Sequence, residues 1–245
     1  MCEYLKDPDT WVSLIALITS IIALFQTSKQ AKLSNKQSLF DRRVSNCWII
    51  NGLFKLYAAN GEMLESADWN KPYYGIQASF LFITNNEFLE NMEEAFGNPF
   101  DFNAKRTFLS KCEYIQRVAE EVPLLFEGAH VESIKKFIEA YKNVLIAMFR
   151  YRIIEKEAER NGLLLSDDSC KIPENRYRKE LHIAVNELKK SYALVESSSA
   201  NKYLIGQIQL RDEQSFIWQG FRLPRKTAAG IEAAFLIGTG SDFAG

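Results

Sequence analysis

The side chains that most often do chemistry are few and scattered in this chain. The two histidines, His130 and His182, belong to no HExxH or His-x-His pattern, so no metal site is predicted. The cysteines are Cys2, Cys47, Cys112 and Cys170. They have no CxxC spacing, which argues against a zinc site and a disulfide framework. We expect solvated or hydrogen-bonded histidines, and core positions for the cysteines at 47 and 112, which lie on apolar helical stripes.

The sequence also lacks the motifs that bind phosphate or activate a nucleophile. GxxxxGK[ST], GxGxxG and GxSxG do not occur, and the Gly-Thr-Gly at 238–240 is too short for a phosphate loop. Carboxylates are plentiful, but Glu155, Glu157 and Glu159 occur at alternate positions together with Lys156 and Arg160, a pattern that indicates a solvated helix face. We predict a protein that is not an enzyme and has no catalytic residue, cofactor or metal. The alternative is a membrane-anchored hydrolase or nuclease with a dispersed carboxylate site.

Composition limits the class of protein further. The chain has 245 residues, of which 47% are hydrophobic and 13% aromatic, enough to bury a core and too apolar for a disordered protein. Its 30 Lys and Arg residues are matched by 31 Asp and Glu residues, whereas a protein that coats nucleic acid needs a basic excess. Nucleic acid is therefore not the partner we expect.

One uncharged segment stands out near the N-terminus. It runs from Trp11 to Phe25 and stays uncharged to Ser28, with Asp9 before it and Lys29 after it. The 19 residues between these two charges would extend about 28 Å as a helix, close to the roughly 30 Å hydrocarbon core of a bilayer. We predict a single transmembrane helix over 11–28, with Trp11 as an interfacial anchor.

Three other interpretations of this segment compete with a membrane span. A secretory signal peptide has a basic leader and a small-x-small cleavage site, whereas residues 1–10 are acidic on balance and no A-x-A follows. An amphipathic surface helix needs a charged face, which 11–25 lacks. A buried helix of a soluble protein stays open as the alternative, because the run is short.

Charges beside the segment predict its orientation. The basic residues that follow it are Lys29, Lys32, Lys36, Arg42 and Arg43. By the positive-inside rule, residues 1–10 form a short external tail and the chain after Lys29 is cytoplasmic. These juxtamembrane basic residues are sufficient to fix topology, and each would also attract anionic lipid by about 1 kcal/mol. The lipid bilayer is therefore the first expected partner.

Small residues recur along the segment at alternating spacings of 3 and 4. They are Ser13, Ala16, Ser20, Ala23 and Thr27. Such a stripe lets two helix backbones approach closely, and hydroxyl groups can hydrogen-bond across the contact. We predict membrane association through Ser13, Ala16, Ser20 and Ala23, either in a homo-oligomer or with a protein partner.

Apolar residues at helical spacing dominate the chain from about 35 to 196. We expect the span to continue into an amphipathic helix that stops at Asn60-Gly61, followed by a loop over 66–74. Further helices are expected over 75–83, 85–96, 103–122, 131–160 and 174–196, with Pro123 and Asn161-Gly162 as stops. The predicted fold class is all-α, with the N-terminal span followed by a cytoplasmic helical domain over 29–196.

The last segment, 197–245, has a different pattern. Apolar runs at 203–210 and 215–223 flank an Arg-Asp-Glu-Gln sequence, which predicts a hairpin or two irregular segments. Five glycines fall within the last 26 residues, so the tail from 228 is expected to be poorly packed. We therefore expect an irregular C-terminal segment, either a short hairpin or an unpaired stretch, with a frayed end.

Several short elements together carry a resemblance. A polar stretch after the span, then Ser38-Leu-Phe-Asp-Arg-Arg43, and then Phe80-Leu-Phe82 before an acidic amphipathic helix resemble a broad group of bacterial single-span helical proteins. Most members of this group are uncharacterised, and some occur among phage-defence and mobile-element genes as membrane-tethered effectors. The resemblance covers roughly residues 11–96 and implies a bacterial inner membrane as the setting. It implies no catalytic residues.

These observations lead to one functional expectation. We expect a membrane-tethered helical protein that acts by oligomerisation or partner binding at the bacterial inner membrane, in phage defence if the resemblance extends to function. The carboxylate hydrolase or nuclease remains its alternative. A structural subunit with a permanent aromatic interface is a third possibility.

Overall fold

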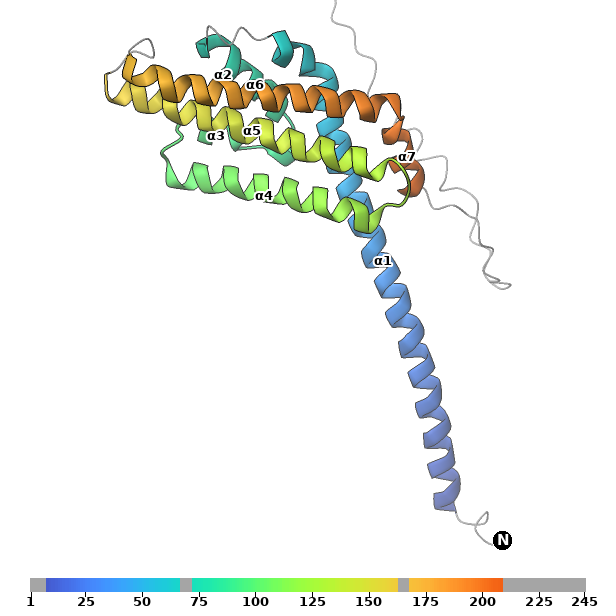
Figure 1. Cartoon of the computed structure of the whole chain (residues 1–245). Helices are drawn as coiled ribbons and strands as arrows, with labels where there is room; N and C mark the ends of the chain where they lie inside the picture. The colour runs from blue at the N-terminus through green and yellow to red at the C-terminus, as the bar shows by residue number, and fades with distance from the viewer. Residues whose placement is uncertain (1–7, 67–71, 163–167, 209–245) are drawn as a thin grey trace, which may run out of the picture. The chain divides into compact units, whose positions relative to one another are not determined.

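The computed structural model describes residues 8–66, 72–162 and 168–208, and every regular element in these ranges is a helix. The helices are α1 (Pro8–Ser66), α2 (Pro72–Thr84), the short 3-10 helix η2 (Glu87–Leu89), α3 (Met92–Gly97), α4 (Phe102–Leu125), α5 (Val131–Arg160), α6 (Asp168–Ser197) and α7 (Ala200–Ile208). These helices all belong to one unit. The all-α fold expected from the sequence is confirmed, with one long apolar helix followed by a helical region (Figure 1).

Helix α1 passes through two environments without a break. Its 59 residues would extend about 88 Å. Every side chain from Trp11 to Leu39 is exposed, whereas Cys47, Ile50 and Phe54 are buried in the bundle. The expected span and the first helix of the bundle are therefore the same element. Figure 1 shows this helix entering the bundle, where its C-terminal part lies behind the other helices.

The stop expected at Asn60-Gly61 was wrong, because tertiary contacts carry α1 on to Ser66. The Asn60 Nδ2 group donates to the Leu56 carbonyl oxygen one turn earlier, at 2.9 Å, and also to the Phe82 carbonyl oxygen at the end of α2, at 3.2 Å. Leu64, one turn beyond, is fully buried. An Asn-Gly pair in isolation favours the end of a helix. Here the burial of Leu64 and the hydrogen bonds of the Asn60 side chain stabilise the helix instead.

The region expected as one helix over 85–96 is divided in two. Asn86 caps η2, because its side chain accepts a hydrogen bond from the Leu89 amide at 2.7 Å. Asn91 then takes a left-handed conformation with φ of 70°, and α3 begins at Met92. Lys111 of α4 reaches back to the Phe88 carbonyl oxygen at 2.5 Å and stabilises the intervening turn. Helix α2 begins at Pro72, inside the expected 66–74 loop, whose residues 67–71 lie outside the described ranges.

Three long helices, α4, α5 and α6, build the bundle and lie side by side in Figure 1. Helix α5 has the expected bounds and ends at Asn161-Gly162, where Gly162 has φ of 63°. Helix α4 extends beyond its expected stop at Pro123, which lies within the final turn. The Phe126 amide still donates to the Val122 carbonyl oxygen. Helix α6 begins at Asp168, earlier than the expected residue 174, so Pro173 falls in its second turn.

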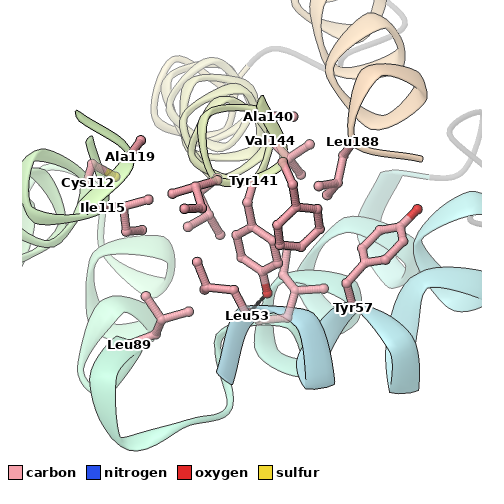
Figure 2. Close-up of a cluster of buried hydrophobic side chains, with 14 of the residues drawn as sticks. Leu53, Tyr57, Leu89, Cys112, Ile115, Ala119, Ala140, Tyr141, Val144 and Leu188 are labelled. Atoms are coloured by element: carbon pink, nitrogen blue, oxygen red, sulfur yellow. Dashed lines mark hydrogen bonds between the residues drawn. The ribbon is translucent and has the colours of Figure 1, made fainter. Parts of the chain in front are cut away.

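The core lies where α1, α2, α4, α5 and α6 meet. Figure 2 shows Tyr141 of α5 at its centre, with Leu53 and Tyr57 of α1 on one side and Cys112 and Ile115 of α4 on another. Both cysteines expected in the core, at 47 and 112, are buried there. The aromatic rings are closely packed; those of Phe108 and Phe149, for example, are stacked with centroids 4.3 Å apart.

The first apolar run, 203–210, was expected to be a hairpin strand or an irregular segment, whereas residues 200–208 form helix α7. Ser199, with φ of 53°, breaks the chain between α6 and α7, as expected near that position. The buried side chains Ala200 and Leu204 then favour a helix, since they are one turn apart and both face the bundle. The second apolar run at 215–223 and the tail from 228 lie outside the described residues.

Candidate functional site

The N-terminal part of α1 carries an apolar surface that the described chain does not cover. An 18-residue window of this helix has a mean hydropathy of 1.8 and none of it is buried. Leu24 and Phe25 are 70% and 68% exposed. A core helix of a soluble protein would bury such a surface within its own fold. Within the described ranges, α1 is the one helix that is long and apolar enough to cross a membrane.

The small-residue stripe predicted in the span forms one narrow face of α1. At about 100° per residue, Ser13, Ala16, Ser20 and Ala23 fall within an arc of roughly 80°. The Ser20 Oγ donates to the Ala16 carbonyl oxygen at 2.7 Å, and the Thr27 Oγ1 donates to the Ala23 carbonyl oxygen at 2.9 Å. Because the hydroxyl groups of Ser20 and Thr27 donate inside the helix, they need no hydrogen bond from a partner, and the small side chains of the face allow close backbone approach.

This face points away from the bundle. At about 100° per residue, the hydrophobic α1 residues buried in the core, from Cys47 to Leu64, are centred roughly 140° around the helix from the centre of the small-residue arc. The relationship follows from the continuity of α1, which fixes the rotation of the span relative to the bundle. The sequence pattern alone does not give this relationship, because it depends on α1 being unbroken between the span and the bundle.

The face also extends beyond the span, into the largely exposed stretch 29–45 that we call the stalk. Ala31, Ser34, Ser38 and Ser45 continue it, and all four are exposed. A shallow hollow of about 420 Å³ lies over this part of α1. Its lining residues are Ser34, Gln37, Ser38, Asp41, Arg42 and Ser45. A strict heptad extrapolated from Ser13 would pass through Gln30 and Gln37, whereas a helix with 3.6 residues per turn shifts the face to Ala31 and Ser38.

The five basic residues predicted beside the membrane are separated by the stalk. Lys29, Lys32 and Lys36 are exposed and lie within about 12 Å of Ser28 along the helix axis. Arg42 and Arg43 lie about 21 Å and 22 Å from Ser28, more than two Debye lengths at physiological ionic strength. Arg43 is half-buried, and its Nε has no hydrogen-bond partner. Only the three lysines are therefore close to the end of the span.

The bundle holds no metal-type cluster among its described residues. No group of three or more His, Cys, Asp or Glu side chains there could hold an ion. His130 precedes α5 and packs edge-on against the Tyr203 ring, with centroids 5.0 Å apart. His182 is on the exposed face of α6. Burial raises the pKa of the Cys47 thiol to about 11 and, as the largest cause, that of Cys112 to about 12, so both are protonated at neutral pH.

Glu155 was expected on a solvated face, and this was wrong. It is 3% exposed and pairs with Arg152, which is 5% exposed, through Glu155 Oε2 and an Arg152 terminal nitrogen. The Arg152 Nε donates to the Phe96 carbonyl oxygen at 3.1 Å, at the end of α3. The second carboxylate oxygen, Oε1, has no hydrogen-bond partner. The glutamates at 157 and 159 are exposed, as expected.

A second, smaller hollow of about 250 Å³ lies between α1, α6 and α7. Its lining residues are Phe54, Tyr192, Val195, Glu196, Ser199, Asn201 and Lys202. The amide of Asn201 donates to the Asn51 Oδ1 atom of α1 at 3.2 Å and so ties α7 to α1 beside this hollow. Burial, with a smaller contribution from Glu196, raises the pKa of Tyr192. The hollow has no convergent set of catalytic groups.

Comparisons of this chain with protein-family models, with curated proteins and with solved structures find no match.

Proposed function

We propose that this chain is a single-pass membrane protein whose cytoplasmic bundle acts by association with other proteins or with copies of itself. The observation that carries the proposal is the contrast in burial between the N-terminal and C-terminal parts of α1. Its N-terminal window has a mean hydropathy of 1.8 with no part buried, whereas its C-terminal part supplies fully buried core residues such as Ile50 and Leu53. An uncovered apolar surface of that length is stable in a bilayer and costly in water.

The first test is extraction of the full chain from membranes. A transmembrane helix resists alkaline carbonate, whereas a peripheral protein is released into the supernatant. Replacing Leu17 and Ile21 by Asp, in the middle of the uncovered window, should release the chain, because each Asp at a helix centre costs about 2.5–3.5 kcal/mol of insertion free energy. Release of the unchanged chain by carbonate would contradict the proposal.

We propose further that residues 1–10 are outside and the bundle is cytoplasmic, in a bacterial inner membrane. The support is the charge asymmetry: Lys29, Lys32 and Lys36 follow the span, and acidic residues precede it. The test uses a variant whose only cysteine is Cys2. A membrane-impermeant maleimide should label Cys2 in intact cells. Labelling only after the cells are permeabilised would place the N-terminus inside.

Association in the membrane is proposed to use the small-residue face. Its support is threefold: the side chains are small and exposed, the Ser20 and Thr27 hydroxyl groups donate within α1, and the face points away from the bundle, so that a partner helix can reach it. Two chains that pair through this face keep their bundles on the outer sides. The bundles therefore do not obstruct the contact.

The test of association replaces Ser13, Ala16 and Ser20 with Leu and measures energy transfer between two labelled populations of the full chain in vesicles. Energy transfer should fall severalfold in this variant, because the leucines hold the backbones apart. The matched control replaces Ile15, Ile18 and Ile22 with Leu on the opposite side of α1. Equal transfer in the unchanged chain and the first variant would exclude this face as the contact.

The resemblance to membrane-tethered effectors extends the proposal to phage defence, with activation that alters membrane integrity. A potential-sensitive dye should then report depolarisation when cells that express the chain are infected with a phage that triggers it. The Leu variant at 13, 16 and 20 should lose this response. Unchanged membrane potential with both chains would contradict the effector role and leave the anchor intact.

A further inference from the structure

The first turns of the stalk carry positive charge that the described chain does not neutralise. Lys29, Lys32 and Lys36 are exposed, and none of them makes an ion pair or hydrogen bond with any residue that the structure describes. No acidic residue occurs between Lys29 and Phe40, and the first, Asp41, lies on the other side of the helix. The stalk therefore begins with three uncompensated charges within about 10 Å of helix.

These three lysines share one side of α1. At about 100° per residue they fall within an arc of roughly 60°, which we call the lysine face. The opposite side at the same heights carries the uncharged residues Gln30 and Ser34. A continuous helix holds this arrangement rigidly, so the charges cannot separate as they would on a disordered linker.

An exposed leucine lies within the same region. Leu33 is 66% exposed and sits at the edge of the lysine face, about 7 Å along the axis from Ser28. The headgroup layer on each side of a bilayer is about 5–7 Å thick, and transmembrane helices tilt by about 20° on average. A tilt toward the lysine face brings Leu33 to the outer edge of this layer. The long Lys36 side chain leans toward the N-terminus of the helix, and so reaches back toward the layer. An apolar side chain flanked by lysines is typical of surfaces that lie in the headgroup region.

We propose that the lysine face binds the phosphate groups of anionic phospholipids in the cytoplasmic leaflet, with Leu33 in the interface. The inference rests on the membrane anchor proposed above and adds the lipid class that the anchor selects. The lysine face is on the same side of α1 as the buried residues Cys47 and Ile50, so the bound headgroups lie beneath the bundle.

The test uses the full chain in vesicles of phosphatidylcholine with phosphatidylglycerol and measures, by electron spin resonance, how strongly spin-labelled forms of each lipid are retained. The unchanged chain should prefer phosphatidylglycerol by about fivefold, the factor expected for even one lysine at an anionic surface. Lys29→Gln/Lys32→Gln/Lys36→Gln should retain both lipids equally. The preference should also fall toward one in 1 M salt, where the Debye length is about 3 Å.

The matched control, Lys55→Gln/Lys136→Gln/Lys190→Gln, removes three exposed lysines of the bundle and should keep the full preference. A preference that survives in the first variant, or disappears in the control, would overturn the assignment to the lysine face. Carbonate extraction of the same vesicles separates the two proposals. A chain that resists extraction but shows no preference contradicts only the lipid inference, whereas a chain that carbonate releases contradicts the anchor and this inference with it.

Discussion

The hydroxyl of Tyr141 donates a hydrogen bond to the carbonyl oxygen of Ile83, 2.5 Å away in the fully buried core. Ile83 is in the last turn of α2, where the carbonyl groups have no partner within the helix. Asn60 of α1 donates to the neighbouring Phe82 carbonyl at 3.2 Å. The end of α2 is therefore capped by side chains from two other helices, which ties α1, α2 and α5 together.

Tyr141→Phe should lower the free energy of unfolding by about 1–3 kcal/mol, because it leaves a buried carbonyl without a donor while keeping the ring. Burial raises the pKa of Tyr141 above its ordinary value, so the hydroxyl is protonated and able to donate at neutral pH. Denaturation of the full chain in detergent, followed by pulse proteolysis of the bundle, measures the change. The control is Tyr114→Phe, at a half-buried ring that packs on Phe88, with an expected change below about 0.5 kcal/mol. Equal effects of the two changes would refute the capping role.

The buried pair of Arg152 and Glu155 should be sensitive to loss of one partner and tolerant of loss of both. Arg152→Met leaves the carboxylate buried and unpaired, at an expected cost of about 3–5 kcal/mol. The double variant Arg152→Met/Glu155→Leu removes both charges and should recover most of that loss, although the Phe96 carbonyl still lacks its donor. The same denaturation assay compares the two, and a double variant no more stable than the single one would show that the charge pair is not the cause.

Two glycines within α1 should respond in opposite directions to alanine. At Gly52 a Cβ would lie 3.4 Å from the Asn86 side chain, an ordinary contact, so the gain in helix propensity of about 0.5–1 kcal/mol should appear as added stability. At Gly61 a Cβ would lie 3.0 Å from the Tyr57 ring, which is buried against Tyr192 with centroids 4.7 Å apart. Overpacking of about 1–3 kcal/mol should therefore outweigh the propensity gain. Thermal melting of the two variants in parallel checks the signs, and a stabilised Gly61→Ala would show that the ring can yield.

Stability should decline in mild alkali because of the buried thiols. The pKa values of Cys47 and Cys112 are raised from 9.0 to about 11 and about 12, so above pH 9 the unfolded chain loses protons that the folded chain keeps. Their contribution is complete below pH 9 and is lost as the pH rises toward 11–12, with a slope of up to about 1.4 kcal/mol per pH unit for each cysteine. Unfolding curves at pH 8, 9 and 10 test this. Cys112→Ala should flatten the decline, and parallel curves for the two chains would contradict it.

Sequence periodicity predicted most of the bundle because long apolar stripes determine helices strongly. Helix α5 has its expected bounds, since its core residues recur at helical spacing and Asn161-Gly162 ends it. Local signals failed where a distant contact decided the outcome. Asn60-Gly61 predicts a helix stop in isolation, but a hydrogen bond from the Asn60 side-chain amide to the Phe82 carbonyl oxygen stabilises the helix there.

The candidate site was predicted in part. The apolar span, the small residues and the lysines were evident from composition and spacing. Their rotation relative to the bundle was not, because it depends on α1 being unbroken from the span to Ser66. Glu155 was missed for a related reason: its i−3 partner, Arg152, faces inward with it, a placement that charge alternation along the helix cannot reveal.

Because α1 is unbroken from the span to the bundle, the rotation of the span about the helix axis fixes the rotation of the bundle. Inserting a single residue in the stalk would turn the bundle by about 100° about the axis of the span and raise it by about 1.5 Å. Eighteen residues, five whole turns, would restore the angle while moving the bundle outward by about 27 Å. The length of the stalk therefore sets both the direction in which the bundle faces and its distance from the span. Only insertions or deletions of whole helical turns would change the distance and keep the direction.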